Sequence, residues 1–121
     1  MKNILLVEDD LFLNDITTKK LSSAGFSVVA VKSTDAAAQK LKEEAVDLVL
    51  LDLELPGQPG NEYLLELKSD AETKHLPVIM FSNNDDPNIA SFCIQSGAAA
   101  FYIKIETDID DLIGKIHEIL D

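Results

Sequence analysis

The amino-acid sequence predicts one α/β domain over residues 1–121, built from five successive βα units. Five short apolar runs, most of them rich in β-branched residues, alternate with longer segments of helical periodicity. No linker rich in proline, glycine or serine and no internal repeat divides the chain, whose 121 residues are typical of a single domain. Runs of this kind are typical of strands buried on both faces, so the pattern predicts a parallel sheet with helices on both sides.

The five predicted strands are short, mostly apolar runs of four or five residues. They are Ile4–Val7, Val28–Val31, Leu48–Leu51, Val78–Phe81 and Phe101–Ile105.

The first two helices are expected to begin and end at typical capping residues. Gly25 is a candidate to end the first helix, and Ser33 or Thr34 can cap the second, which continues through Glu44. Each helix has apolar residues that fall on roughly one face. They are Leu13, Ile16, Leu21 and Ala24 in the first helix, and Ala37, Ala38, Leu41 and Ala45 in the second.

The last three helices carry similar signals. Gly60 leads into the third helix, and Gly97 ends the fourth. Asp86-Pro87 opens the fourth, because proline is tolerated in the first helical turn. Thr107 is a candidate cap for the fifth. The residues predicted to face inward are Tyr63, Leu64 and Leu67 in the third helix, Ile89, Phe92, Cys93 and Ile94 in the fourth, and Ile109, Leu112, Ile113, Ile116, Ile119 and Leu120 in the fifth.

The charge balance excludes several classes of partner. Ten Lys and Arg stand against 22 Asp and Glu, which gives a net charge of −12 at pH 7. Nucleic acids and anionic membranes are bound by basic surfaces, so cations and basic protein surfaces are the expected partners instead. Cys93 is the only cysteine, which excludes an intrachain disulfide and a cysteine-based metal site. No apolar run suits a membrane span or a signal peptide, so a cytoplasmic location is expected.

Polar and charged residues follow four of the predicted strands at their carboxyl ends. Glu8-Asp9-Asp10 follows the first strand, Asp52 the third and Ser82 the fourth, and Lys104 lies near the end of the fifth. Each of these residues taken alone also fits a solvated turn, a cap or a surface position. Functional residues of open α/β sheets collect at this edge, so if these strands are neighbours we expect the side chains to converge.

A cluster of this composition is suited to phosphoryl chemistry. Adjacent carboxylates in a crevice raise one another's pKa unless a cation is present, and Mg²⁺ takes carboxylates, waters and phosphate oxygens as ligands. A carboxylate beside such an ion can attack phosphorus and form an aspartyl phosphate. Lys104 and Ser82 would then stabilise the phosphoryl oxygens by charge and by a hydrogen bond.

This ordered set of motifs resembles the response-regulator receiver domain of two-component signalling, over essentially the whole chain. The motifs are the acidic pair Glu8-Asp9, Asp52 followed by the Leu55-Pro56 turn, Ser82 after the fourth strand, and Lys104 after an aromatic residue. The resemblance implies a flavodoxin-like, doubly wound (βα)5 fold whose five-stranded parallel sheet has the order 2-1-3-4-5.

The resemblance also implies a role for each residue of the acidic cluster. Asp52 is the expected phosphoacceptor. Asp9 is expected to bind Mg²⁺ directly, Glu8 more loosely through water, and the backbone carbonyl of Glu54 as a further ligand. Lys104 is expected, together with the hydroxyl of Ser82, to contact the phosphoryl group.

Partners and output follow from the same resemblance. A sensor histidine kinase or a histidine phosphotransfer protein is the expected donor, and the domain catalyses only its own phosphorylation and dephosphorylation, so no multiple-turnover enzyme is expected. Ser82 and Phe101 are the expected switch residues. They would change a surface made of Asp86–Ser96, Ala100–Lys104 and Asp108–Leu120, which controls a downstream protein target. The chain, whether independent or part of a longer protein, is expected to be a monomer or weak dimer.

Three residues depart from the family's pattern. Ile105 stands where the family usually has a cis proline, so we predict a trans Lys104–Ile105 bond and a shifted loop, because a cis bond without proline costs roughly 2.5–4 kcal/mol. Asn83 replaces a small residue, and its bulk is expected to obstruct Asp52, so that the phosphoryl group leaves no faster than from an Asn83→Ala variant. Phe101 lacks a hydroxyl, which excludes a switch that depends on an aromatic O–H.

Two alternatives stay open. The departures at residues 83 and 105 leave room for a pseudo-receiver that is not phosphorylated and acts only as a protein docking module. Such a module would give no response to beryllofluoride with Mg²⁺. The second alternative is a hydrolase, because Asp52-Leu53-Glu54 after a strand is similar to the Asp-x-Asp motif of haloacid-dehalogenase-type phosphatases. Those enzymes carry the motif on their first strand and need a larger cap or core.

Overall fold

The computed structural model describes residues 1–121 and confirms the predicted (βα)5 architecture. One parallel sheet has the order β2-β1-β3-β4-β5, as the resemblance implied. Its strands are β1 (Asn3–Val7), β2 (Ser27–Val31), β3 (Leu48–Leu51), β4 (Val78–Ser82) and β5 (Ala100–Ile103). The helices are α1 (Leu11–Ser23), α2 (Thr34–Glu43), α3 (Gly60–Ser69), α4 (Pro87–Gln95) and α5 (Ile109–Leu120), with a short 3₁₀ turn η1 (Lys104–Glu106) before α5.

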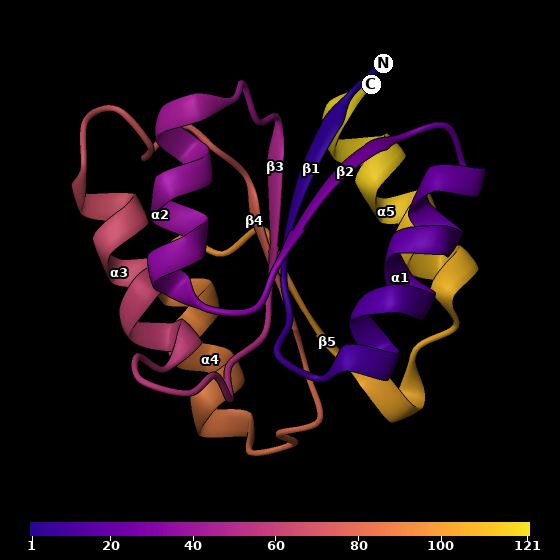
Figure 1. Ribbon diagram of the computed structural model, residues 1–121. Helices are drawn as coiled ribbons and strands as arrows, with labels where there is room; N and C mark the ends of the chain where they lie inside the picture. The colour runs from indigo at the N-terminus through magenta and orange to yellow at the C-terminus, as the bar shows by residue number, and fades with distance from the viewer.

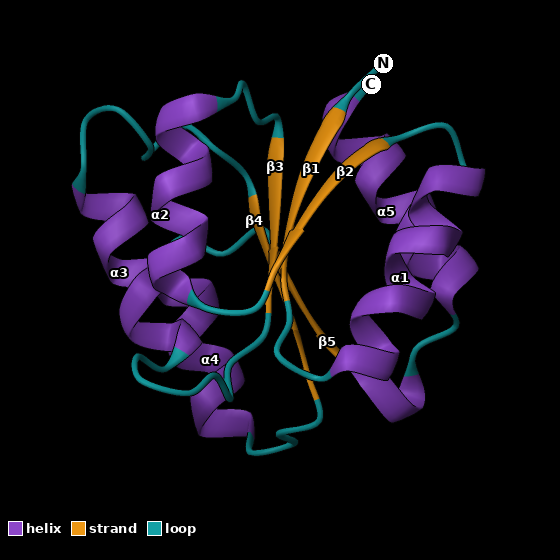
Figure 2. Ribbon diagram, in the orientation of Figure 1, coloured by secondary structure: helices purple, strands orange, loops and turns teal.

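The helices cover both faces of the sheet. Helices α1 and α5 lie together on one side, and α2, α3 and α4 lie on the other (Figure 1; Figure 2). None of these helices combines the length and the apolar character that crossing a membrane would require.

Two separate apolar cores result, one on each face of the sheet. Successive side chains of a strand point to opposite faces. Leu5 and Val7 of β1 therefore belong to the core beneath α2, α3 and α4, whereas Ile4 and Leu6 belong to the core beneath α1 and α5. The same alternation continues through β3 and β4. The predicted runs of β1, β3 and β4 are thus buried on both sides, whereas those of the edge strands β2 and β5 are partly exposed. Burial of the three central strands fixes the strand ends that Glu8, Asp52 and Ser82 occupy.

Most of the predicted helix ends are confirmed. Gly25 and Gly97 follow α1 and α4 with φ of +98° and +112°, a conformation that glycine adopts without strain. Ser33 caps α2, since its hydroxyl accepts the N–H of Ala36, and Asp86 caps α4. The prediction for α5 was wrong. Asp108 rather than Thr107 is the cap, because its carboxylate accepts the N–H of Asp110.

Some predicted inward-facing residues are exposed. Phe92 and Ile94 of α4 lie outward, while Cys93 is fully buried. Ala45 is exposed, because α2 already ends at Glu43. Ile16 of α1 is also exposed.

Ile16 was wrongly predicted to face inward because the neighbouring residue that is buried, Thr17, is polar. The inward-facing stripe runs through the half-buried Leu13 and the buried Thr17 and Leu21 at intervals of four, and Thr17 is buried despite its hydroxyl. Ile16 lies one position away from this stripe, which is about 100° around the helix. An apolar residue close to the buried face was therefore mistaken for part of it.

The fifth strand is shorter than predicted. It ends at Ile103, and Lys104 and Ile105 begin the η1 turn, so Ile105 is not a strand residue and is 83% exposed. The backbone N–H of Ile105 donates to the side-chain oxygen of Asn83. The structure has no cis peptide bond, which confirms the predicted trans bond between Lys104 and Ile105.

Cys93 is expected to be unreactive in the folded protein. Its side chain is fully buried, and burial raises the pKa of the thiol, so little of the reactive thiolate forms near neutral pH. A colourless disulfide reagent that releases a chromophore should therefore label the thiol only in denaturant. Rapid, complete labelling in native buffer would show that α4 separates readily from the sheet.

Candidate functional site

The carboxyl ends of the strands form an acidic pocket of about 350 Å³. Its lining residues are Glu8, Asp9, Asp10, Leu13, Asp52, Glu54, Asn83 and Lys104. The pairing register of β1 and β3 brings Glu8 and Asp52 together. Val7 pairs with Leu51 in neighbouring strands, so Glu8 and Asp52, the next residues of each strand, emerge side by side. The predicted convergence is confirmed for these residues.

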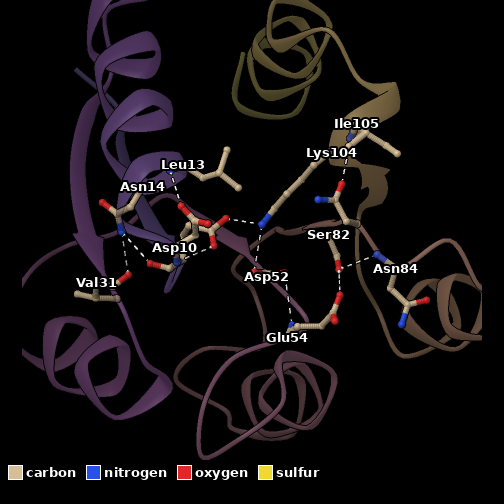
Figure 3. A network of polar contacts seen from close by, with 12 residues as sticks. Asp10, Leu13, Asn14, Val31, Asp52, Glu54, Ser82, Asn84, Lys104 and Ile105 are labelled. Atoms are coloured by element: carbon tan, nitrogen blue, oxygen red, sulfur yellow. Dashed lines mark hydrogen bonds and ion pairs between the residues drawn. The ribbon is translucent and has the colours of Figure 1, made fainter.

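Lys104 lies between two buried carboxylates (Figure 3). Its Nζ is 2.5 Å from Oε1 of Glu8 and 3.1 Å from Oδ2 of Asp52. The side chains of Lys104, Glu8 and Asp52 are only 9%, 3% and 7% exposed. The ammonium group therefore partly neutralises two carboxylates that would otherwise repel each other.

Burial and the charge of the partner act in opposite directions on the pKa values of Glu8 and Lys104. Burial raises the pKa of Glu8, and the negative charge of Asp52 adds to this effect, while Lys104 opposes it without cancelling it. Burial lowers the pKa of Lys104, but the hydrogen bonds and charges of Glu8 and Asp52 outweigh it, so that the pKa of Lys104 is raised. Lys104 is thus held in its charged form.

Glu8, Asp9 and Asp52 are arranged as possible ligands of a divalent cation. Each offers a carboxylate oxygen, and these oxygens lie within 4.8 Å of one another. Glu8 and Asp52 are buried, whereas Asp9 is exposed at the pocket mouth. Hard cations such as Mg²⁺ prefer a donor set of this kind and keep several waters. The residues present therefore fit the metal that the sequence led us to expect.

Ser82 faces the same region but is bound to Glu54 (Figure 3). Its buried hydroxyl donates to Oε1 of Glu54 at 3.4 Å and accepts the N–H of Asn84 at 3.2 Å. The sequence led us to expect only a backbone carbonyl from Glu54, and its side chain, one of five carboxylates that line the pocket, was missed. The signal was present, since an acidic residue two positions after Asp52 stays close to the strand end.

Asp10 and Asn14 position the acidic pair. Oδ1 of Asp10 accepts the N–H of Leu13 and so caps α1, while the backbone N–H of Asp10 donates to Oε2 of Glu8. The side-chain amide of Asn14 donates to the carbonyls of Glu8 and Val31. The role of Asp10 as a cap could have been predicted, because an aspartate directly before a helical pattern is a typical N-cap. Nothing in the sequence indicated the role of Asn14.

Gly60 allows the loop after β3 to fold back against the pocket. Its N–H donates to the carbonyl of Leu53 at 2.7 Å. A Cβ at this position would lie 1.9 Å from the carbonyl oxygen of Asp52. The start of α3 therefore packs directly on the backbone of Asp52.

Phe101 lies on β5 beside Met80 of β4. Its side chain is half-buried and packs against the core beneath α2, α3 and α4. It thus lies on the face of the sheet that α4 covers.

A comparison with known families identifies the domain. The family described as response regulator receiver domain matches residues 4–117, nearly the whole chain. The chain belongs to this family. Receiver domains act in two-component signalling with a histidine kinase or phosphotransfer protein, and they are not multiple-turnover enzymes. Family membership excludes the haloacid-dehalogenase-type hydrolase.

Individual relatives agree with this assignment. The protein named two-component response regulator-like APRR9 from Arabidopsis thaliana is 37% identical over 103 residues, which are 84% of this chain and 22% of that protein. This chain spans between about a fifth and about a half of the length of such curated relatives.

Solved structures have the same fold. A CheY-like receiver domain protein from Methanospirillum hungatei superimposes with a TM-score of 0.91 at 29% identity, covering 100% of this chain and 94% of that one. The Mn²⁺-bound form of response regulator Rcp1 has a TM-score of 0.81 at 23% identity, covering 98% and 91%, which is a likeness of fold.

Proposed function

We propose that residues 1–121 form one receiver domain that accepts a phosphoryl group on Asp52 in the presence of Mg²⁺. The phosphoryl donor is a sensor histidine kinase or a histidine phosphotransfer protein. The observation that carries this proposal is the position of Asp52, which is buried, 3.1 Å from Lys104, and clustered with the carboxylates of Glu8 and Asp9. An aspartate in this setting is both held in place and close to positive charge.

The ligands proposed for Mg²⁺ are Asp9, Asp52 and the backbone carbonyl of Glu54, with Glu8 acting through water. Oxygen donors from carboxylates, a carbonyl and water suit this ion, and the Mn²⁺-bound Rcp1 is an example of a receiver fold that binds a divalent metal. The ion would neutralise negative charge on the carboxylates and on the incoming phosphoryl oxygens.

The protein's own residues perform the transfer. An oxygen of Asp52 forms the new P–O bond while the P–N bond to the donor histidine breaks, and the electron pair leaves on the imidazole nitrogen. Lys104 stabilises the added negative charge through its ammonium group. The hydroxyl of Ser82 turns from Glu54 to the phosphoryl group.

The movement of Ser82 provides the proposed switch. It frees space next to β5, into which Phe101 packs, and this alters the surface formed by α4, β5 and α5. A new charge that shifts a bistable packing arrangement is a common form of protein switch. The altered surface would control a downstream protein target.

Exposed apolar residues beside the pocket support a protein donor. Leu11 and Phe12 follow the pocket residue Asp10, and Ile105 follows Lys104. All three side chains are largely exposed. Exposed apolar groups next to a reactive site are typical of a protein interaction surface.

Mass spectrometry tests the proposal directly. After incubation with a small acyl phosphate and Mg²⁺, wild type should gain a single phosphoryl group, and Asp52→Ala should gain none. Asp85→Ala, which removes an exposed loop carboxylate outside the pocket, should behave as wild type. A chelator should prevent the reaction.

Two results would contradict the proposal. Equal phosphorylation of Asp52→Ala would place the acceptor elsewhere. No phosphorylation of wild type, with no thermal or spectral response to beryllofluoride and Mg²⁺, would favour the docking module instead.

A further inference from the structure

We infer that Asn83 and Ile105 form a latch across the mouth of the acidic pocket, and that this latch slows loss of the phosphoryl group from Asp52. The latch is the single hydrogen bond between these two residues, and the part concerning phosphoryl loss rests on the function proposed above. In this inference Asn83 acts through a specific hydrogen bond. The sequence had suggested instead that the bulk of its side chain obstructs Asp52.

The contact joins two loops that are far apart in sequence. Oδ1 of Asn83 accepts the backbone N–H of Ile105 at 3.1 Å, across 22 residues (Figure 3). Asn83 directly follows Ser82 and itself lines the pocket, and Ile105 directly follows Lys104. The latch therefore connects the loops that carry the two residues proposed to hold the phosphoryl group.

Both partners are chemically necessary for the contact. Proline at position 105 would have no N–H to donate, and a small apolar residue at position 83 would have no oxygen to accept it. The two departures from the family's pattern, at residues 83 and 105, are thus the two halves of one hydrogen bond. Asn83 supplies the acceptor and Ile105 supplies the donor, so neither residue forms the bond without the other.

The latch restrains the Lys104 segment from a second direction. The side chain of Lys104 is already fixed by Glu8 and Asp52, and the latch fixes the backbone that follows it. The same bond holds the Asn83 side chain beside the pocket mouth instead of leaving it to rotate into solvent. With Asn83 held in the lining of the pocket, its side chain stands in one approach of water to a phosphoryl group on Asp52, and we expect hydrolysis to be slower while the latch is closed.

Four single variants separate the hydrogen bond from the bulk of the side chains. Asn83→Leu keeps a side chain of similar size but loses the acceptor, and Ile105→Pro loses the donor. Asn83→Asp keeps an acceptor oxygen, and Ile105→Ala keeps the backbone N–H while it removes the exposed side chain. The first two variants open the latch, and the last two are their matched controls.

The first measurement is hydrogen exchange of the Ile105 amide, followed by NMR without phosphorylation. Exchange should be about fivefold faster in Asn83→Leu than in wild type, the factor that corresponds to a net hydrogen-bond contribution of about 1 kcal/mol. Asn83→Asp should remain close to wild type. Equal exchange in wild type and Asn83→Leu would show that the latch does not exist in solution.

The second measurement is the lifetime of phosphorylated Asp52 after removal of a small acyl phosphate donor. Asn83→Leu, Ile105→Pro and the double variant should all lose the group about fivefold faster than wild type, because one bond is lost in each. Ile105→Ala should match wild type. An unchanged lifetime in Asn83→Leu and Ile105→Pro, with faster loss only in Asn83→Ala, would assign the effect to bulk and overturn the inference.

The two measurements distinguish failure of the latch from failure of the proposed function. A wild-type chain that takes up no phosphoryl group would defeat the proposed function and, with it, the effect on lifetime. The exchange of the Ile105 amide would still decide whether the latch exists.

Discussion

Gly60→Ala is expected to lower the free energy of unfolding by about 3 kcal/mol, a value at the upper end of overpacking effects. A Cβ at residue 60 would lie 1.9 Å from the carbonyl oxygen of Asp52, 2.8 Å from its carbonyl carbon and 2.9 Å from Cα of Leu53. All three are backbone atoms, so no side-chain rotation relieves the overlap. The end of β3 must separate from the start of α3, which moves Asp52 away from Lys104.

Gly114→Ala is the matched control for this substitution. A Cβ at Gly114 meets nothing within 4 Å, and the residue lies inside α5. Alanine favours a helix over glycine, so this variant should be stabilised by up to about 1 kcal/mol. Urea unfolding of both variants measures the contrast. A Gly60→Ala variant as stable as wild type would show that the packing of α3 on Asp52 is looser than described.

Lys104→Met is expected to lower the free energy of unfolding by about 3 kcal/mol in the absence of divalent metal, as in other buried ion pairs that lose one partner. Glu8 and Asp52 would stay buried without a cation between them. Added Mg²⁺ should stabilise this variant more than it stabilises wild type, because the ion then provides the only positive charge. Phosphorylation by a small acyl phosphate should be lost.

Lys19→Met removes the same charge from a surface ion pair. Lys19 is 74% exposed and lies 2.9 Å from Asp15, one turn away in α1. Pairs of this kind contribute at most about 0.5 kcal/mol, so urea unfolding should barely change. Equal stability losses in the two lysine variants would mean that net charge matters more than burial, which would contradict the role given to Lys104.

The sheet and the composition of its edge could be predicted because both depend on short-range pattern. Apolar runs such as Leu48–Leu51 are recognisable alone, and the first residue after such a run must lie at the sheet edge. The convergence of Glu8, Asp52 and Lys104 follows once the strand order is known. The same pattern does not decide which residues of a short helix face inward, and so Phe92 and Ile94 were misplaced.

Contacts that depend on loop conformation and side-chain rotamers were beyond prediction. The carboxylate of Glu54 reaches Ser82 only because the loop after β3 folds back at Gly60. The acceptor role of Asn83 depends on where η1 presents the N–H of Ile105. Neither contact follows from residue type or spacing alone, although Asn83 and Ile105 were both recognised as departures from the family's pattern.

The bond between Lys104 and Glu8 joins residues 96 positions apart, near the two ends of the sequence. Contacts at such separation carry the entropic cost of closing a long loop before they contribute any stability. The pocket therefore acquires its central cation only when β5 has added to the sheet. A chain in which this edge strand has not yet joined the sheet still carries its acidic residues, but it has no lysine to hold them together.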